Sequence, residues 1–174
     1  METGVGGALI ALVEDLLPDL LLLVAIACRL LAFGLFLAGA LRLVRHGTGT
    51  REHPAAGTAI TFLAAAVLFG LPAWLDGAGD TLFGDARHAG VLGYASGGPD
   101  LTRLIEAVFA IVAVVGLAAF IRGVFVLRAA ADNVPGASAA TAAMHLIGGI
   151  AAWHMPALVG ALQTTLGIHI LDIS

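Results

Sequence analysis

Apolar residues in this chain form four long runs that are separated by polar stretches. The runs cover residues 20–44, 58–75, 104–127 and 141–168. A helix rises about 1.5 Å per residue, so about 20 apolar residues are enough to cross the hydrocarbon core of a bilayer. The pattern therefore predicts an all-α membrane protein with four transmembrane helices.

The first 18 residues have a different pattern. Apolar residues from Val5 to Leu17 recur at helical spacing, Glu14 and Asp15 lie among them, and Pro18 follows. This arrangement is typical of a short helix in the membrane interface, which a proline can end. We therefore predict that residues 1–18 form an N-terminal interfacial helix. The segment has no positively charged start of the kind found in signal peptides, so we expect it to be retained.

One motif occurs twice along the chain. Phe69-Gly-Leu-Pro-Ala-Trp-Leu75 corresponds to Trp153-His-Met-Pro-Ala-Leu-Val159, which places Pro72 and Pro156 84 residues apart. At the same offset, Gly39 corresponds to Gly123. Because repeats determine architecture, we predict a tandem duplication of one helical hairpin. The two hairpins would cover residues 19–85 and 104–174, with a connecting loop over residues 86–103.

The arginines predict the topology. Five of them border the two short loops, namely Arg42, Arg45, Arg51, Arg122 and Arg128. The chain ends and the central loop are mostly acidic. Since short cytoplasmic loops carry an excess of basic residues, we expect both arginine loops to be cytoplasmic and both termini to be outside. The two hairpins would then insert in the same orientation, as a parallel repeat.

The composition agrees with a membrane protein and excludes several kinds of chemistry. The chain is 60% hydrophobic and only 11% charged, and its mean hydropathy is +1.01. It contains no lysine, so neither a Schiff base nor a phosphate-loop lysine can form. The single cysteine, Cys28, lies in an apolar run and suits a small buried hydrophobe. We find no basic patch for nucleic acid and no recognisable catalytic spacing, and we therefore do not expect an enzyme.

Arg29 is the most unusual residue of the first apolar run, because a charge at the middle of a bilayer costs about 2.5–3.5 kcal/mol on insertion scales. A structural ion pair with Glu106, on the equivalent helix of the second hairpin, is one explanation. Contact with a lipid phosphate is another, and an ion or proton path is a third.

The fourth run contains two histidines and several small residues. His145 and His154 are nine residues apart on one predicted helix, which does not suit a haem clamped between facing helices. We expect hydrogen-bonded or interfacial histidines, with no metal and no cofactor. Small residues such as Gly148 and Gly149 permit close approach of helices in lipid. We predict helix packing at these glycines and at Pro72 and Pro156.

The last third of the chain resembles a family of bacterial proteins. The segment from His145-Leu-Ile-Gly-Gly149 through Thr164-Thr-Leu-Gly167 is similar to the small multi-spanning inner-membrane proteins of type IVB systems. These systems are the Dot/Icm secretion apparatus and the IncI-type conjugation machinery. The resemblance implies a structural subunit in the bacterial inner membrane, with other subunits of the apparatus as partners.

The layout of each half also resembles a conjugative pilin, with outside ends, two spans and a basic cytoplasmic loop. That resemblance implies a homopolymer that forms a tube and retains phospholipid, and that reaches the cell surface when assembled. The arginines Arg42, Arg45, Arg51, Arg122 and Arg128 would then contact lipid headgroups or line a lumen. The alternative is a small oligomeric channel or an ion-coupled transport protein that uses Arg29 and Glu106.

Overall fold

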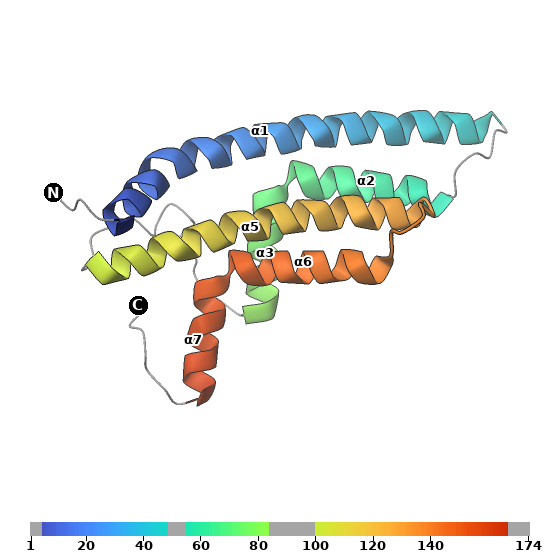
Figure 1. The fold of residues 1–174 in the computed structure, drawn as a ribbon. Helices are drawn as coiled ribbons and strands as arrows, with labels where there is room; N and C mark the ends of the chain where they lie inside the picture. Colours follow the sequence, from blue (N-terminus) through green and yellow to red (C-terminus); the bar gives the residue numbers. More distant parts are fainter. Residues whose placement is uncertain (1–4, 49–54, 84–99, 167–174) are drawn as a thin grey trace.

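The computed structural model describes residues 5–48, 55–83 and 100–166, and within these ranges the chain consists of helices and short turns (Figure 1). The predicted all-α class is therefore confirmed for this part. α1 and α5 run in the same direction, and α2 and α6 run antiparallel to them (Figure 1). The helices are α1 (Val5–Gly47), α2 (Ala55–Phe69), α3 (Leu71–Phe83), α5 (Asp100–Ala131), α6 (Ala139–Trp153) and α7 (Met155–Leu166).

α1 is one continuous helix of 43 residues with Pro18 inside it. The prediction that Pro18 ends a separate interfacial helix over residues 1–18 is therefore wrong. A proline inside a helix removes one backbone hydrogen bond and bends the helix, and α1 is bent in its N-terminal third (Figure 1). The leucines on both sides of Pro18 favour helix, so the chain bends without breaking.

The predicted second and fourth spans are each broken into two helices. α2 and α3 meet at an angle of 92°, and α6 and α7 meet at 79°. Pro72 and Pro156 are the second residues of α3 and α7, where a proline disturbs no helical hydrogen bond. Each proline therefore begins a new helix after the bend. The repeated motif of the sequence encodes these two bends.

Two glycine contacts occupy positions that are related by the repeat offset of 84 residues. Gly39 of α1 packs against the ring of Phe62 of α2. A β-carbon added at Gly39 would lie 3.1 Å from that ring. On α5, Gly123 lies against Leu146 on α6 in the same way, at 2.9 Å. Both residues of the second contact are 84 positions after those of the first. We refer to α1 with α2–α3 as hairpin 1 and to α5 with α6–α7 as hairpin 2.

The turn between α5 and α6 agrees with the sequence. Asn133 and Gly136 have positive φ angles of 56° and 82°, which asparagine and glycine adopt at low cost. Ser138 caps α6, because its side chain accepts a hydrogen bond of 3.1 Å from the backbone N–H of Thr141. The turn directly follows Asp132, and so it holds that carboxylate at the end of the bundle.

The surface of the helices is strongly apolar. On α1, Leu23, Leu30 and Phe33 are 66%, 70% and 68% exposed. By length and composition, α1 and α5 can each cross a membrane, and the described helices provide up to four spans if each bent pair counts as one. α2 and α6 have 15 residues each and cover only about 22 Å, which is less than the hydrocarbon core. Among the described helices, α1 and α5 are therefore the two that are long and apolar enough to cross a membrane on their own.

Candidate functional site

A polar cluster joins the two hairpins at the end of the bundle where α1 and α5 finish. Arg42 of α1 donates from Nη1 and Nη2 to the two carboxylate oxygens of Asp132, at 2.7 and 2.9 Å. The two side chains are only 14% and 13% exposed. Two parallel hydrogen bonds of this kind match the planar fork of arginine to a carboxylate. The geometry therefore fixes the end of hairpin 1 against the turn of hairpin 2.

Thr61 on α2 completes this cluster. Its hydroxyl accepts from Nη1 of Arg42 and from Nε of Arg128, both at 3.4 Å, and donates to the carbonyl of Gly57 at 2.7 Å. Gly57 lies so close to the Asp132 side chain that a β-carbon there would collide with it. Because Gly57 has no side chain, the carboxylate of Asp132 can lie directly against α2. Neither Thr61 nor Asp132 was predicted, because neither belongs to a sequence motif.

This cluster changes the role of the loop arginines. Arg42 and Arg128, which we expected to face headgroups or a lumen, have partners within the protein. Arg45 and Arg122 are exposed, and they stay candidates for headgroup contact. Arg51 lies outside the described residues.

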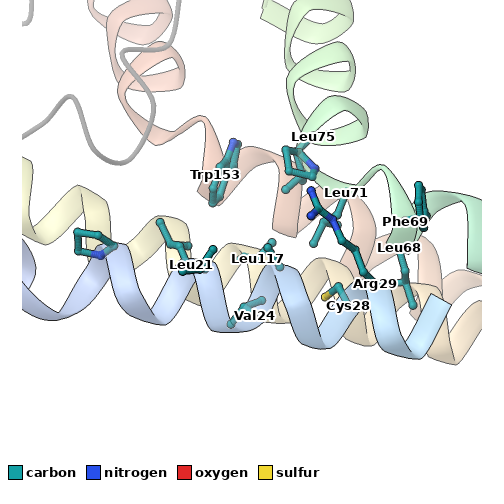
Figure 2. Close-up of a pocket in the computed structure, with 14 residues that line it drawn as sticks. Leu21, Val24, Cys28, Arg29, Leu68, Phe69, Leu71, Leu75, Leu117 and Trp153 are labelled. Atoms are coloured by element: carbon teal, nitrogen blue, oxygen red, sulfur yellow. The ribbon is translucent and has the colours of Figure 1, made fainter. Parts of the chain in front are cut away.

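A second place of interest is a groove of about 490 Å³ between α1, the α2–α3 bend and the end of α6 (Figure 2). Its walls are almost entirely apolar and include Leu21, Leu68, Leu75, Leu117 and Trp153. Arg29 is the charged residue among those that line it. Its side chain extends from α1 toward the bend at Leu71 (Figure 2). The groove exists because α3 and α7 leave the bundle at their bends and do not continue along α1.

The structure does not form the predicted ion pair between Arg29 and Glu106. Instead, Arg103 of α5 donates to Glu14 of α1 at 3.2 Å. That contact places Glu106 level with Leu17, which is twelve residues or about 18 Å along α1 from Arg29. The prediction is wrong because it aligned the two helices by the repeat offset of 84, whereas Glu14 and Arg103 are 89 positions apart.

The histidines are hydrogen-bonded, as expected. Nδ1 of His145 is 2.8 Å from the carbonyl oxygen of Thr141 on the same helix. His154 occupies the bend between α6 and α7, where it is 2% exposed and its Nε2 lies 2.9 Å from the carbonyl oxygen of Leu75. Gly79 on α3 lies directly against the imidazole, which would collide with a β-carbon there. His154 therefore connects the bend of hairpin 2 to α3 of hairpin 1.

The two glycines that we predicted to pack helices behave differently. A β-carbon at Gly149 would be 2.7 Å from the carbonyl oxygen of Gly116 and 2.8 Å from Cβ of Phe120, so Gly149 brings α6 close to α5. Gly148 has open space beside it. Pro72 lines the groove, and Pro156 begins α7. Within the described residues, no group of three or more histidine, cysteine or acidic residues is arranged to hold a metal ion.

Comparisons with protein-family models, with curated proteins and with solved structures found no match to this chain.

Proposed function

We propose that this protein is a structural membrane subunit of a type IVB-like conjugation or secretion apparatus, and that it assembles head to tail with further copies of itself. In this proposal each bent pair counts as one span, and the two hairpins insert in parallel orientation into the bacterial inner membrane. The resemblance of the last third of the chain supports the choice of apparatus. The contact between the two hairpins supports the mode of assembly.

Inside one chain, α2 of hairpin 1 packs against α5 of hairpin 2. Arg128 on α5 donates to Thr61 on α2 at 3.4 Å. A β-carbon at Gly57 on α2 would be 3.2 Å from the carbonyl oxygen of Ala131 on α5. This face of α2 is thus buried because hairpin 2 covers it.

The equivalent face of α6 is largely exposed. At the repeat offset of 84, Gly57 and Thr61 correspond to Thr141 and His145. Thr141 is exposed, His145 is half-buried, and the next turn of this face is Gly148 with open space beside it. The face of α2 that packs against α5 thus has a counterpart on α6, and this counterpart lies on the outer side of hairpin 2.

The complementary face lies on α1. Arg128 and Leu117 of α5 correspond to Val44 and Phe33 of α1 at the same offset. Leu117 is 5% exposed, whereas Phe33 and Val44 are 68% and 65% exposed. Within one chain, α2 packs against α5. In the same way, α6 of one copy can pack against α1 of the next copy. A contact between two different faces joins copies head to tail, and it produces a filament when the rotation between successive copies does not close a ring.

Cysteine cross-linking tests this arrangement. By the repeat offset of 84, the contact between Thr61 and Arg128 inside one chain predicts a contact between His145 of one copy and Val44 of the next. We expect a variant carrying His145→Cys and Val44→Cys, in a Cys28→Ala background, to form a ladder of dimers, trimers and larger species with a short bifunctional maleimide. The matched control pairs His145→Cys with Leu43→Cys, since Leu43 is 60% exposed but points about 100° away on the helix.

The outcomes separate the assembly from its alternatives. A ladder that forms equally with the control pair would indicate random collision and refute the proposed contact. Dimers alone would indicate a closed pair and not a filament. Small closed oligomers that pass ions across liposomes, together with the lack of filaments in sheared surface material viewed by negative-stain microscopy, would favour the channel.

A further inference from the structure

The bend between α2 and α3 falls inside an apolar run that is long enough to cross a membrane as one helix. α2 has 15 residues and covers only about 22 Å, whereas the hydrocarbon core of a bilayer is about 30 Å thick. The apolar run over residues 58–75 continues beyond the bend and would cover about 27 Å if it were one helix. Gly70, the residue between α2 and α3, is the hinge at which the two arrangements differ.

The groove beside α1 has the length and the position that α3 would need in a continuous helix. α2 runs antiparallel to α1, and Phe62 lies opposite Gly39 (Figure 1). α3 begins nine residues after Phe62 and ends 21 residues after it, so as a continuation of α2 it would lie opposite residues 18–30 of α1. The residues of α1 that line the groove extend from Pro18 to Arg29. The groove is therefore the space that α3 leaves empty by bending away.

The faces of α2 also continue correctly onto α3. Residues seven positions apart share one face of a helix. Thr61 and Leu68 are buried, and Leu75 is the next residue of this face. Phe62 faces α1, and Asp76 follows it by 14 residues, or two steps of seven. In a continuous helix, Leu75 would therefore extend the buried face and Asp76 would face α1.

This register brings Asp76 to Arg29. Asp76 would lie opposite Ala25, which is one helical turn before Arg29 and leaves room with its small side chain. A helical side chain points toward the N-terminus of its helix, so the guanidinium of Arg29 would extend toward that level. In the bent arrangement Asp76 is exposed, and Arg29 forms no ion pair with the described residues. Because a charge in an apolar span is costly unless an opposite charge compensates it, the continuous helix would supply what Arg29 lacks.

His154 of hairpin 2 holds α3 in the bent position. Its Nε2 lies 2.9 Å from the carbonyl oxygen of Leu75, and its buried imidazole lies directly against Gly79. Both contacts are with α3, and α3 cannot enter the groove unless they are broken. At the repeat offset of 84, His154 corresponds to Gly70. The two hairpins thus have different residues at their bends, a hinge in hairpin 1 and a hydrogen-bonding side chain in hairpin 2.

We propose that α3 alternates between two positions. In the bent state His154 holds α3 outside the bundle and the groove is open, as in the structure (Figure 2). In the extended state α3 lies in the groove as a continuation of α2, and Asp76 pairs with Arg29. Pro72 then removes one backbone hydrogen bond and kinks the helix, just as α1 includes Pro18 without a break. This conformational change takes place within one chain and does not depend on the assembly proposed above.

Disulfide trapping in native membranes tests the extended state. Asp80 follows Phe62 by 18 residues, or about five helical turns, so it would lie opposite Leu21 in the extended state. A variant with Leu21→Cys and Asp80→Cys, in a Cys28→Ala background, is oxidised with copper phenanthroline. Loss of free thiols is followed as a mass shift with a maleimide polymer. The matched control combines Asp80→Cys with Leu23→Cys, because Leu23 is 66% exposed and does not line the groove. We expect the Leu21 pair to form a disulfide at least ten-fold faster than the control pair.

Three further substitutions separate the parts of the proposal. His154→Ala removes the hydrogen bond to α3 and should speed disulfide formation in the Leu21 pair at least three-fold. Arg29→Gln and Asp76→Asn should each slow it at least three-fold, with no change in the Leu23 pair. Equal rates for the Leu21 and Leu23 pairs would overturn the proposal, and so would rates that neither Arg29→Gln nor Asp76→Asn changes. If His154→Ala does not fold, the comparison of the two cysteine pairs with His154 intact decides the question.

Discussion

Arg42 and Asp132, which are 90 positions apart in the sequence, share two hydrogen bonds and so tie the end of α1 to the turn after α5. Both groups are largely buried, and the two hairpins approach each other there. A buried ion pair contributes little when it is compared with well-packed apolar residues. Removal of one partner, by contrast, leaves an uncompensated charge.

Loss of either partner alone should therefore destabilise the protein. We expect Arg42→Leu or Asp132→Leu to lower the stability by about 3 kcal/mol. The double variant should recover a large part of this loss. Thermal unfolding in detergent measures the effect, with Arg122→Leu as a control at an exposed arginine. Losses that simply add in the double variant would show that the pair is not coupled.

Gly79 should tolerate no side chain, because His154 fills the space beside it. Gly79→Ala would displace the imidazole from Leu75 and should cost about 1–3 kcal/mol, as is typical of overpacking. In the Gly79→Ala, His154→Ala double variant the new methyl group would occupy space vacated by the ring, so the two losses should not add. Gly77→Ala on the same helix is the control, because a β-carbon there meets nothing within 4 Å. A similar loss at both glycines would show that helix propensity, and not contact with His154, is responsible.

The sequence was sufficient to predict the helical class, because that class depends on local pattern. The tandem duplication stays a prediction. Hydropathy cannot reveal the first bend, since the apolar run over residues 58–75 continues from α2 through the bend into the first residues of α3. The prolines were a usable signal. Pro72 and Pro156 occupy the first turn of a helix and would be unfavourable inside one. In contrast, Pro18 lies inside α1, so a proline alone does not decide whether a helix ends.

The candidate sites were less predictable, because they depend on the register between helices. Arg29 was recognised from its charge, but its surroundings required the stagger of α1 against α5 that Glu14 and Arg103 reveal. The cluster of Thr61 and Asp132 joins residues from three parts of the chain. No spacing in the sequence indicates such a cluster.

The neighbouring glycines of α6 should respond differently to substitution. Gly149→Ala would place a methyl group 2.7 Å from the carbonyl oxygen of Gly116, a backbone atom that cannot move aside cheaply. We expect a loss of about 1–3 kcal/mol and a lower yield of folded protein. Gly148→Ala should leave the monomer as stable as the wild type or slightly more stable, since alanine favours helix over glycine. Equal losses at the two positions would contradict the close contact of α5 with α6 at Gly149.

The last prediction concerns the orientation of the bent pairs in the membrane. The arginines favour a cytoplasmic position for the α5–α6 turn, and the hairpin arrangement then places α3 on the opposite side. Val134 in the turn is 48% exposed, and Gly77 on α3 is exposed with open space around it. Single cysteines at these two positions, in a Cys28→Ala background, therefore report on the two sides separately.

An impermeant maleimide added to intact spheroplasts should label Gly77→Cys and should label Val134→Cys only after the membrane is permeabilised. This result would show that α2 and α3 together carry the chain across the membrane, as a broken span does. Labelling of neither position before permeabilisation would indicate that the α2–α3 pair re-enters from the cytoplasmic side without crossing. Labelling of Val134→Cys in intact spheroplasts would reverse the topology, and the arginine loops would then face the outside.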